Sequence, residues 1–198
     1  MDMNMIMPAI IKESSSGFLR CGIQDELFLS REIECIGEVT QASAYALILQ
    51  LRYLQRQAPQ EEVTMYINSP GGEVTSGLAL YDVMQAVSCP IRSVCVGQAS
   101  SIAALLFMSG EKGRRDMLPH SRIMIHDPLI AGGMGGSALR MDAVAKDLMK
   151  ARETAASIIA GHTGHTLEEV YEKTGTDTYF DASEATAWGM ADRIIQKI

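Results

Sequence analysis

Serine, histidine and glycine-rich turns, residue types that cooperate in acyl transfer, recur close together in the middle of the chain. Ser101 ends the segment Gly97–Ser101, which follows the apolar run Ile91–Val96 and leads into a second apolar run. A serine at a strand-to-helix junction can act as a nucleophile, because a helix start leaves backbone N–H groups free beside it. Upstream, the segment 67–72 also places a turn after an apolar strand, and downstream His126 supplies an imidazole. These residues predict acyl-transfer chemistry.

Each of these residues also has a purely structural interpretation. A serine at the start of a helix is more often a cap than a nucleophile. The turn at Gly71 and Gly72 is by itself a plain glycine turn, although glycine also lets bare backbone approach a substrate. The sequence around Ser101 lacks the G-x-S-x-G pattern, which disfavours the α/β-hydrolase fold.

The residues alone leave open which base and which carboxylate would complete such a site. His126 competes with three other histidines, His120, His162 and His165. Asp127 adjoins His126, but successive side chains of a strand point to opposite faces, which counts against it. Spacing does not choose among the remaining downstream aspartates, which are Asp142, Asp147, Asp177, Asp181 and Asp192.

Alternating strands and helices must position these side chains. Apolar spacing and cap residues predict helices from Ala42 to Pro59 with Thr40 as cap, from Ser76 to Val87, directly after Ser101, and from about Ser137 to Ala160. Strands are predicted at 63–67, 91–96, 116–118 and 121–126, with a glycine-rich loop at Gly132–Gly136. Thr166 with Glu169, and Asp181 with Glu184, have the spacing of capping boxes. The pattern predicts an α/β fold with mainly parallel pairing, whereas residues 12–17 are predicted to form a mobile loop.

Composition excludes several classes of function. The chain has 198 residues, enough for one domain with a real core, and a formal net charge of -7. This charge argues against a nucleic-acid partner, because phosphate contacts need clustered Lys or Arg. The four cysteines form no C-x-x-C pair and predict no metal site. The start of the chain lacks the pattern of a signal peptide, and no apolar run is long enough to span a bilayer, so we expect a cytoplasmic setting without membrane contact.

Five motifs, taken in order, resemble one known family along nearly the whole chain, from about Pro8 to Ile198. They are Tyr66–Gly72, Tyr81-Asp82-x-Met84-Gln85, Gly97-Gln98-Ala99-x-Ser101, Leu118–His126 and His162-Thr163-Gly164. Their order, and the spacing from Gly72 to Ser101 and from Ser101 to His126, are similar to those of the proteolytic subunit of the ATP-dependent Clp protease (ClpP family). The resemblance implies that Ser101 is the nucleophile, His126 the general base and Asp177 the carboxylate that orients the imidazole. It also implies that the backbone N–H groups of Gly72 and Ile102 form the oxyanion hole.

The same resemblance implies a fold and an assembly. The fold is expected to be a ClpP/crotonase-like stack of ββα units over residues 31–198, with a protruding strand-helix handle at about 127–160 and an N-terminal axial-pore segment at 1–30. Two stacked heptameric rings would enclose a chamber in which unfolded proteins are cut to short peptides. A hexameric AAA+ unfoldase would dock outside and use the ATP, so that this chain itself needs no cofactor and no metal. Whether a second type of proteolytic subunit joins the rings is left open.

Three departures from the family pattern concern the contact between the rings. Thr178 stands where the family often has Arg, Asp127 stands where Gln usually follows the histidine, and the stretch from His126 to Asp177 is slightly longer than usual. We therefore expect the two rings to pair more weakly, or through different contacts. The alternative to an active endopeptidase is a structural or partner-dependent ring subunit with little activity alone. A crotonase-type acyl-CoA enzyme would also stabilise an oxyanion with backbone N–H groups, but its reaction does not need the combination of Ser, His and Asp.

Overall fold

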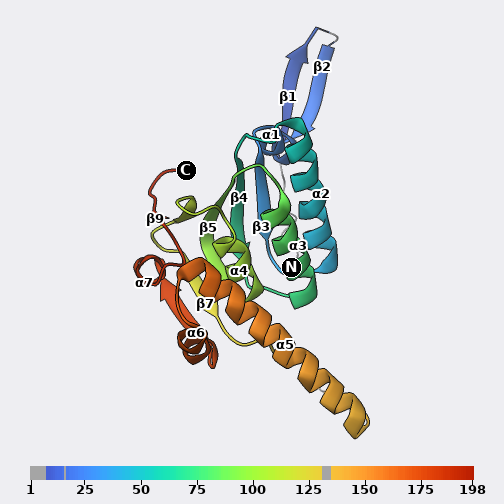
Figure 1. Ribbon diagram of the computed structural model, residues 1–198. Coiled ribbons are helices and arrows are strands. Elements are labelled where there is room, and N and C mark those ends of the chain that lie inside the picture. The colour runs from blue at the N-terminus through green and yellow to red at the C-terminus, as the bar shows by residue number, and fades with distance from the viewer. Residues whose placement is uncertain (1–7, 16, 131–134) are drawn as a thin grey trace.

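The computed structural model describes residues 8–15, 17–130 and 135–198 (Figure 1). The helices are α1 (Ile23–Leu29), α2 (Gln41–Gln57), α3 (Val74–Ala86), α4 (Ile102–Met108), α5 (Ala138–Thr163), α6 (Leu167–Thr174) and α7 (Ala182–Ala187). The strands are β1 (Ala9–Ser14), β2 (Gly17–Gly22), β3 (Glu32–Ile36), β4 (Val63–Ser69), β5 (Ile91–Ser100), β6 (Arg115–Met117), β7 (Arg122–Ile125), β8 (Thr178–Asp181) and β9 (Arg193–Ile194). The predicted α/β class is confirmed.

Strand β5 organises the main sheet, in which the order is β3-β4-β5-β6-β9. Its first half pairs with β6 over Ser93–Cys95, and its last residues, Gln98–Ser100, pair with β7 instead. It therefore continues past the predicted end at Val96. All pairings in this sheet are parallel except that of β7 with β8. The far end of β5 and the two short strands β7 and β8 thus form a separate corner of the sheet.

Helices α2, α3 and α4 pack on one face of the sheet and bury the core. On β4, Met65 and Ile67 point to this face and are fully buried, whereas Asn68 is exposed. Helix α2 contributes Ala44, Leu47, Leu51 and Leu54, spaced as expected for one apolar stripe. All seven residues of α4 are buried. A short helix enclosed on every side shows no amphipathic pattern, but it holds its first residue rigidly against the end of β5.

The predicted capping residues are confirmed in the structure. The Thr40 hydroxyl accepts a hydrogen bond from the N–H of Ser43 at the start of α2. The two predicted capping boxes open α6 and α7, with reciprocal bonds between Thr166 and Glu169 and between Asp181 and Glu184. These bonds satisfy N–H groups that a helix start would otherwise leave unpaired.

Helix α5 extends well beyond the rest of the molecule (Figure 1). It ends at Gly164, which has φ of 83°, a conformation that favours glycine at a helix C-terminus. The strand part of the expected handle is not formed by residues 126–130 or 135–137, because a strand needs a partner for its backbone groups. Most of the predicted Gly132–Gly136 loop lies outside the described residues.

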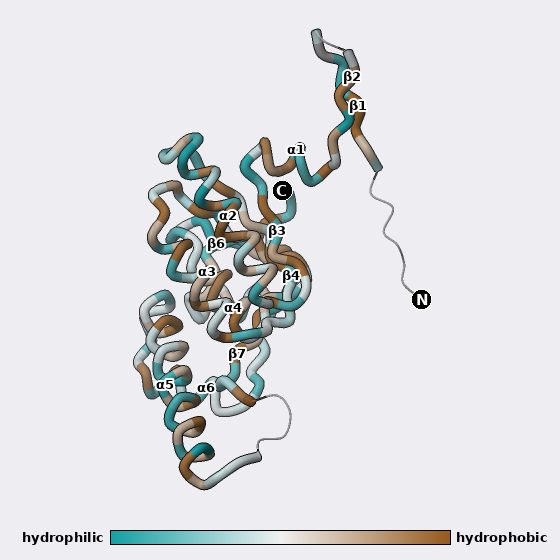
Figure 2. The backbone as a smooth tube through the Cα atoms, turned by 90° about the vertical axis from the view of Figure 1, so that its right-hand side faces the viewer, coloured by the Kyte–Doolittle hydropathy of each residue, from teal (hydrophilic) through white to brown (hydrophobic). Residues whose placement is uncertain are grey.

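The N-terminal segment differs from the predicted mobile loop. Strands β1 and β2 form an antiparallel hairpin, with Lys12 opposite Leu19, and both views show this hairpin standing clear of the body (Figure 2). The residues of β2 from Gly17 to Arg20 are exposed. Without a buried face the alternation of apolar and polar residues that signals a strand is absent, and for this reason the sequence did not predict the pairing. Residues 1–7 of the expected axial segment lie outside the described residues.

Candidate active site

Ser101 occupies a strained junction between β5 and α4. Its φ of 57° and ψ of −128° are values that a residue with a side chain rarely adopts. The N–H of Ser101 donates to the carbonyl of Met124 at 2.8 Å, which ties the junction to β7. The side chain makes no capping hydrogen bond, so the common structural interpretation of a serine at a helix start does not apply.

His126 directly follows β7 and faces the Ser101 hydroxyl. Ser100 pairs with Met124 in the parallel ladder. Ser101, the next residue, and His126, two residues after Met124, therefore lie at the same corner of the sheet. The Ser101 Oγ lies 2.8 Å from Nε2 of His126, and 16% of the histidine side chain is exposed. A neutral imidazole that carries its proton on Nδ1 can accept the hydroxyl proton at Nε2.

Asp177 lies on the other side of the imidazole, directly before β8. Ile125 pairs with Thr178 in the antiparallel ladder of β7 and β8, so the residues just beyond this pair, His126 and Asp177, face each other. Their Nδ1 and Oδ1 atoms are 3.2 Å apart. The structure thus brings together Ser101, His126 and Asp177 from the ends of three adjacent strands.

The competing aspartates are engaged elsewhere. Asp127 pairs with Arg152 at 2.5 Å rather than with the neighbouring imidazole, as the alternation of strand side chains predicted. Asp181 caps α7, and its backbone lies opposite Arg122 at the other end of the β7–β8 ladder. Asp142 contacts Lys146, Asp192 contacts Arg115, and Asp147 is exposed on α5.

The competing histidines are also placed away from Ser101. His162 Nε2 lies 3.0 Å from the Tyr81 hydroxyl, and burial, followed by the nearby Arg115, lowers the pKa of His162. His165 stacks on Trp188 and contacts Glu169. His120 lies exposed in the turn before β7.

The glycine turn after β4 packs directly against the serine. Gly71 has φ of 95°, and a Cβ added there would lie 2.7 Å from the Cβ of Ser101. A Cβ on Gly72, whose φ is 154°, would lie 2.2 Å from the carbonyl oxygen of Val39. Val39 also donates to the Gly71 carbonyl at 2.8 Å and accepts from the Glu73 N–H at 2.7 Å. Only glycine fits this turn, and nothing in the sequence indicated that Val39 would hold it.

The second predicted N–H donor belongs to Ile102, the first residue of α4. The first N–H groups of an α-helix have no intrahelical acceptor, and the amide of Ile102 adjoins Ser101 directly. The side chain of Ile102 is buried, 4% exposed, and contacts Gly77 of α3, where an added Cβ would lie 2.1 Å from it. This packing fixes the orientation of the peptide unit that follows the serine.

The buried cysteines Cys35 and Cys95 do not offer an alternative nucleophile. All four are free thiols, and burial raises the pKa of Cys95 to about 12 and that of Cys35 to about 11. The thiolate is the reactive form of cysteine, so these two side chains stay protonated near neutral pH. Among the described residues, no group of three or more His, Cys, Asp or Glu side chains is arranged to hold a metal ion.

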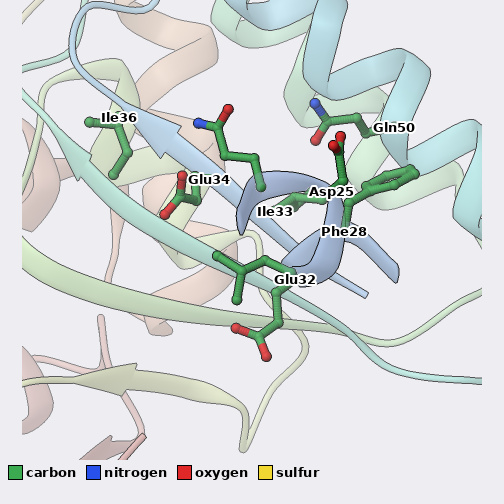
Figure 3. Close-up of a pocket in the computed structure, with 9 residues that line it drawn as sticks. Asp25, Phe28, Glu32, Ile33, Glu34, Ile36 and Gln50 are labelled. Carbon is green, nitrogen blue, oxygen red and sulfur yellow. The ribbon is translucent and has the colours of Figure 1, made fainter. Parts of the chain in front are cut away.

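A separate hollow of about 560 Å³ lies between α1, β3 and α2 (Figure 3). It is lined by Gln24, Asp25, Leu27, Phe28, Glu32, Ile33, Glu34, Ile36 and Gln50. None of these residues belongs to the serine site, and the acidic side chains of Glu32 and Glu34 come from the exposed face of β3. The hollow is therefore not the place where Ser101 would meet a substrate.

Within the described part of the chain, no helix has the length and apolarity needed to cross a membrane. In a comparison with known families, residues 18–198 match the model of the Clp protease family. The matched region includes every residue of the Ser101 site and all of the main sheet. Because it covers most of the 198 residues, the chain belongs to the Clp protease family.

Proposed function

We propose that this chain is a serine endopeptidase, the proteolytic subunit of an ATP-dependent protease, in which Ser101, His126 and Asp177 form the catalytic triad. One observation carries the proposal. The Ser101 Oγ lies 2.8 Å from His126 Nε2, and His126 Nδ1 lies 3.2 Å from Asp177 Oδ1, so the three groups form a continuous hydrogen-bonded chain. Membership of the Clp protease family supports the same conclusion.

The geometry supports the following steps. Ser101 Oγ forms a bond to the carbonyl carbon of the scissile amide while its proton passes to His126 Nε2. Asp177 accepts a hydrogen bond from Nδ1–H and stabilises the imidazolium that results. The tetrahedral intermediate then collapses, the carbon–nitrogen bond breaks, and the proton on Nε2 goes to the leaving amine. A water molecule hydrolyses the acyl ester by the same route and returns the proton to Ser101.

The oxyanion of the intermediate would be held by the N–H groups of Gly72 and Ile102. Both are main-chain donors, so the isoleucine side chain is no obstacle. Their positions are fixed by rigid neighbours, because two backbone hydrogen bonds to Val39 hold the glycine turn and α4 is buried throughout. Preorganised donors of this kind stabilise the transition state without reorganisation.

We further propose that two heptameric rings of this chain enclose a chamber, and that a hexameric AAA+ unfoldase supplies unfolded chains and consumes ATP. The proposed reaction uses no metal or cofactor, because every group it requires comes from the chain itself. A net charge of -7 supports a protein rather than a nucleic acid as substrate.

The alternative, a subunit that is active only with partners, is favoured by the exposure of Asp177. In the single chain 58% of the Asp177 side chain is exposed to solvent. Water competes for a carboxylate of this kind and weakens its hold on the imidazole. Contacts in an assembly could shield it.

Labelling of the purified protein with a fluorophosphonate probe tests the proposal. We expect labelling at Ser101, located by peptide mass spectrometry, together with cleavage of a fluorogenic peptide. Ser101→Ala is the matched control and should lose both signals while keeping the same melting temperature and oligomeric state. A folded, assembled protein that is not labelled would favour the partner-dependent alternative, and labelling at another serine would overturn the assignment.

A further inference from the structure

Arg152, in the middle of α5, contacts both Asp127, which follows His126, and Tyr171 of α6. Its Nε donates to Oδ2 of Asp127 at 2.5 Å, and its guanidinium carbon lies 3.9 Å from the ring centroid of Tyr171 in α6. Only 26% of the Arg152 side chain and 32% of the Asp127 side chain are exposed. Pairing with a carboxylate while stacking on an aromatic ring fixes the guanidinium in two directions, which the flexible ammonium of lysine cannot reproduce.

Asp127 transmits this contact to the main chain beside His126. Its N–H donates to the carbonyl of Thr174 at 2.7 Å, and Thr174 is the last residue of α6. The side chain of Asp127 therefore holds α5, while its backbone holds the end of α6. Nothing in the proposed reaction uses the carboxylate of Asp127.

These contacts close a ring around the His126–Asp177 hydrogen bond. On one side, the β7–β8 ladder joins Ile125 to Thr178. On the other side, Asp127 joins Thr174, which lies three residues before Asp177 in the chain. The distance between the imidazole and the carboxylate is thus set by main-chain bonds on both sides. Among the described residues, the Asp177 side chain hydrogen-bonds only to His126.

We propose that Arg152 is a positioning residue of the catalytic site. By holding Asp127 and Tyr171 together, it keeps α6 and the segment after β7 at the separation that aligns Asp177 with His126. The handle helix α5 is thereby connected to the triad within a single chain. This inference rests on the proposed function, because alignment of the triad matters only if the triad is catalytic.

Kinetics of Arg152→Gln and Asp127→Asn test this role. Because a misplacement of about 1 Å can cost about 100-fold in rate, we expect kcat for a fluorogenic peptide to fall about tenfold or more, with KM changed less than about twofold. Arg152→Lys should lower kcat as well. Lysine keeps the positive charge but lacks the planar guanidinium, with its paired N–H donors, that stacks on the Tyr171 ring. The reversed pair, Asp127→Arg with Arg152→Asp, should recover part of the loss. Lys146→Gln is the matched control, because Lys146 makes an exposed ion pair with Asp142 on the same helix.

Two results would overturn the positioning role. One is an unchanged kcat in Arg152→Gln; the other is a loss of kcat that is fully accounted for by a lower fraction of folded or assembled protein. Amide hydrogen exchange gives a readout independent of activity. We expect faster exchange in peptides covering 125–130 and 174–178 in Arg152→Gln than in Lys146→Gln.

The exchange measurement also separates the two proposals. If the unmodified protein is folded and assembled but not labelled at Ser101, the partner-dependent alternative is favoured over the proposed function, while faster exchange in Arg152→Gln still supports the connection between α5 and the site. If the unmodified protein is active but exchange and kcat match those of the Lys146→Gln control, the positioning role is wrong and the proposed function stands.

Discussion

At the scale of single residues, Ser101 combines chemistry with backbone strain. Its φ of 57° makes it, with Arg31, one of two non-glycine residues of positive φ among those that the structure describes. Such conformations cost of the order of 1–3 kcal/mol and persist only where the surroundings enforce them. Here the bond from Ser101 N–H to Met124 and the buried α4 enforce it. The strained position points the hydroxyl at His126 instead of into the helix.

This strain predicts a difference between two inactive variants. Ser101→Ala and Ser101→Gly should both lose peptidase activity, because neither has a hydroxyl. Glycine adopts positive φ freely, so Ser101→Gly should be more stable than Ser101→Ala by about 1 kcal/mol. Urea unfolding monitored by circular dichroism measures the difference. Equal stability, or a less stable glycine variant, would mean that Ser101 is not strained in solution.

A second prediction concerns the proposed role of Asp177. Asp177→Asn should lower kcat by about 100-fold or more without a comparable change in KM, because the amide no longer favours the correct tautomer of His126. Steady-state kinetics on a fluorogenic peptide measures both constants. Asp181→Asn, at the far end of the β7–β8 ladder, is the control and should leave kcat unchanged. If Asp181→Asn lowers kcat and Asp177→Asn does not, Asp181 would be the carboxylate that orients His126.

The sequence alone predicted part of this site. Ser101 and the glycine turn could be found because each follows an apolar strand, and chemistry of this type is expected where a strand ends beside a helix. The choice of His126 and Asp177 rested on resemblance. Their meeting depends on the register of β7 and β8 and on the parallel pairing of β5 with β7, and the spacing of aspartates along a sequence does not encode register.

At the scale of elements, the glycine turn after β4 links Val39 to the serine. A Cβ on Gly72 would meet three backbone atoms of Val39 within 2.9 Å. Backbone atoms cannot rotate out of the way as a flexible side chain can. The turn must therefore open if any other residue replaces this glycine, and the proposed oxyanion donor would move with it.

We accordingly expect Gly72→Ala to lose both stability, by about 3 kcal/mol or more, and peptidase activity. Gly113→Ala is the matched control, because Gly113 has φ of 89° with nothing within 4 Å of an added Cβ. It should cost only about 1 kcal/mol, for the backbone conformation. Thermal unfolding and fluorophosphonate labelling of the two variants make the comparison, and similar losses in both would argue against a tight contact with Val39.

Helices α3 and α5 are joined by a contact that should respond to pH. The Tyr81 hydroxyl of α3 lies 3.0 Å from Nε2 of His162 near the end of α5, and burial is the main cause that lowers the pKa of this histidine. The unfolded chain therefore takes up a proton on His162 more readily than the folded one. The resulting stability is present above the ordinary pKa of histidine, about 6.5, and is lost as the pH falls below it toward the folded value.

His162→Gln should remove this part of the acid sensitivity, since the glutamine carbonyl can accept a hydrogen bond from the Tyr81 hydroxyl but does not titrate. We expect the free energy of unfolding of the unmodified protein to fall more between about pH 7.5 and pH 5.5 than that of His162→Gln. Urea titrations at both values measure the two decreases. His120→Gln, at an exposed turn, should behave like the unmodified protein, and equal decreases in all three would contradict the prediction.

The elements themselves were predictable to the extent that they bury a face. The apolar stripe of α2 and the capping boxes of α6 and α7 can each be recognised from a few neighbouring residues. The structure contains all three helices. Strand β3 and the β1–β2 hairpin were not predicted. The hairpin is largely exposed, so its pairing rests on backbone hydrogen bonds that leave no pattern in the side chains.

At the scale of the whole molecule, a single chain leaves large apolar side chains of α5 uncovered. Leu139 is 84% exposed, Met149 58% and Met141 44%, and α5 carries them away from the body (Figure 1). Exposed apolar side chains gathered on one element are typical of an interaction surface. They agree with the proposal of two stacked rings, because burial of these side chains against a second ring would be the main source of affinity.

Two polar residues that the sequence analysis associates with the contact between rings, Thr178 and Asp127, make hydrogen bonds within the chain. The Thr178 hydroxyl donates to the carbonyl of Lys173 at 2.7 Å, and Asp127 is paired with Arg152. Because the Thr178 proton and one oxygen of Asp127 are already engaged within the chain, we expect paired rings to separate on dilution and activity per chain to fall in parallel. Analytical ultracentrifugation and peptidase assays over the same concentration series measure both quantities. If the apolar side chains of α5 suffice for tight pairing, one tetradecamer with constant specific activity will persist at the lowest concentration, and the internal pairing of Thr178 and Asp127 will have no consequence for assembly.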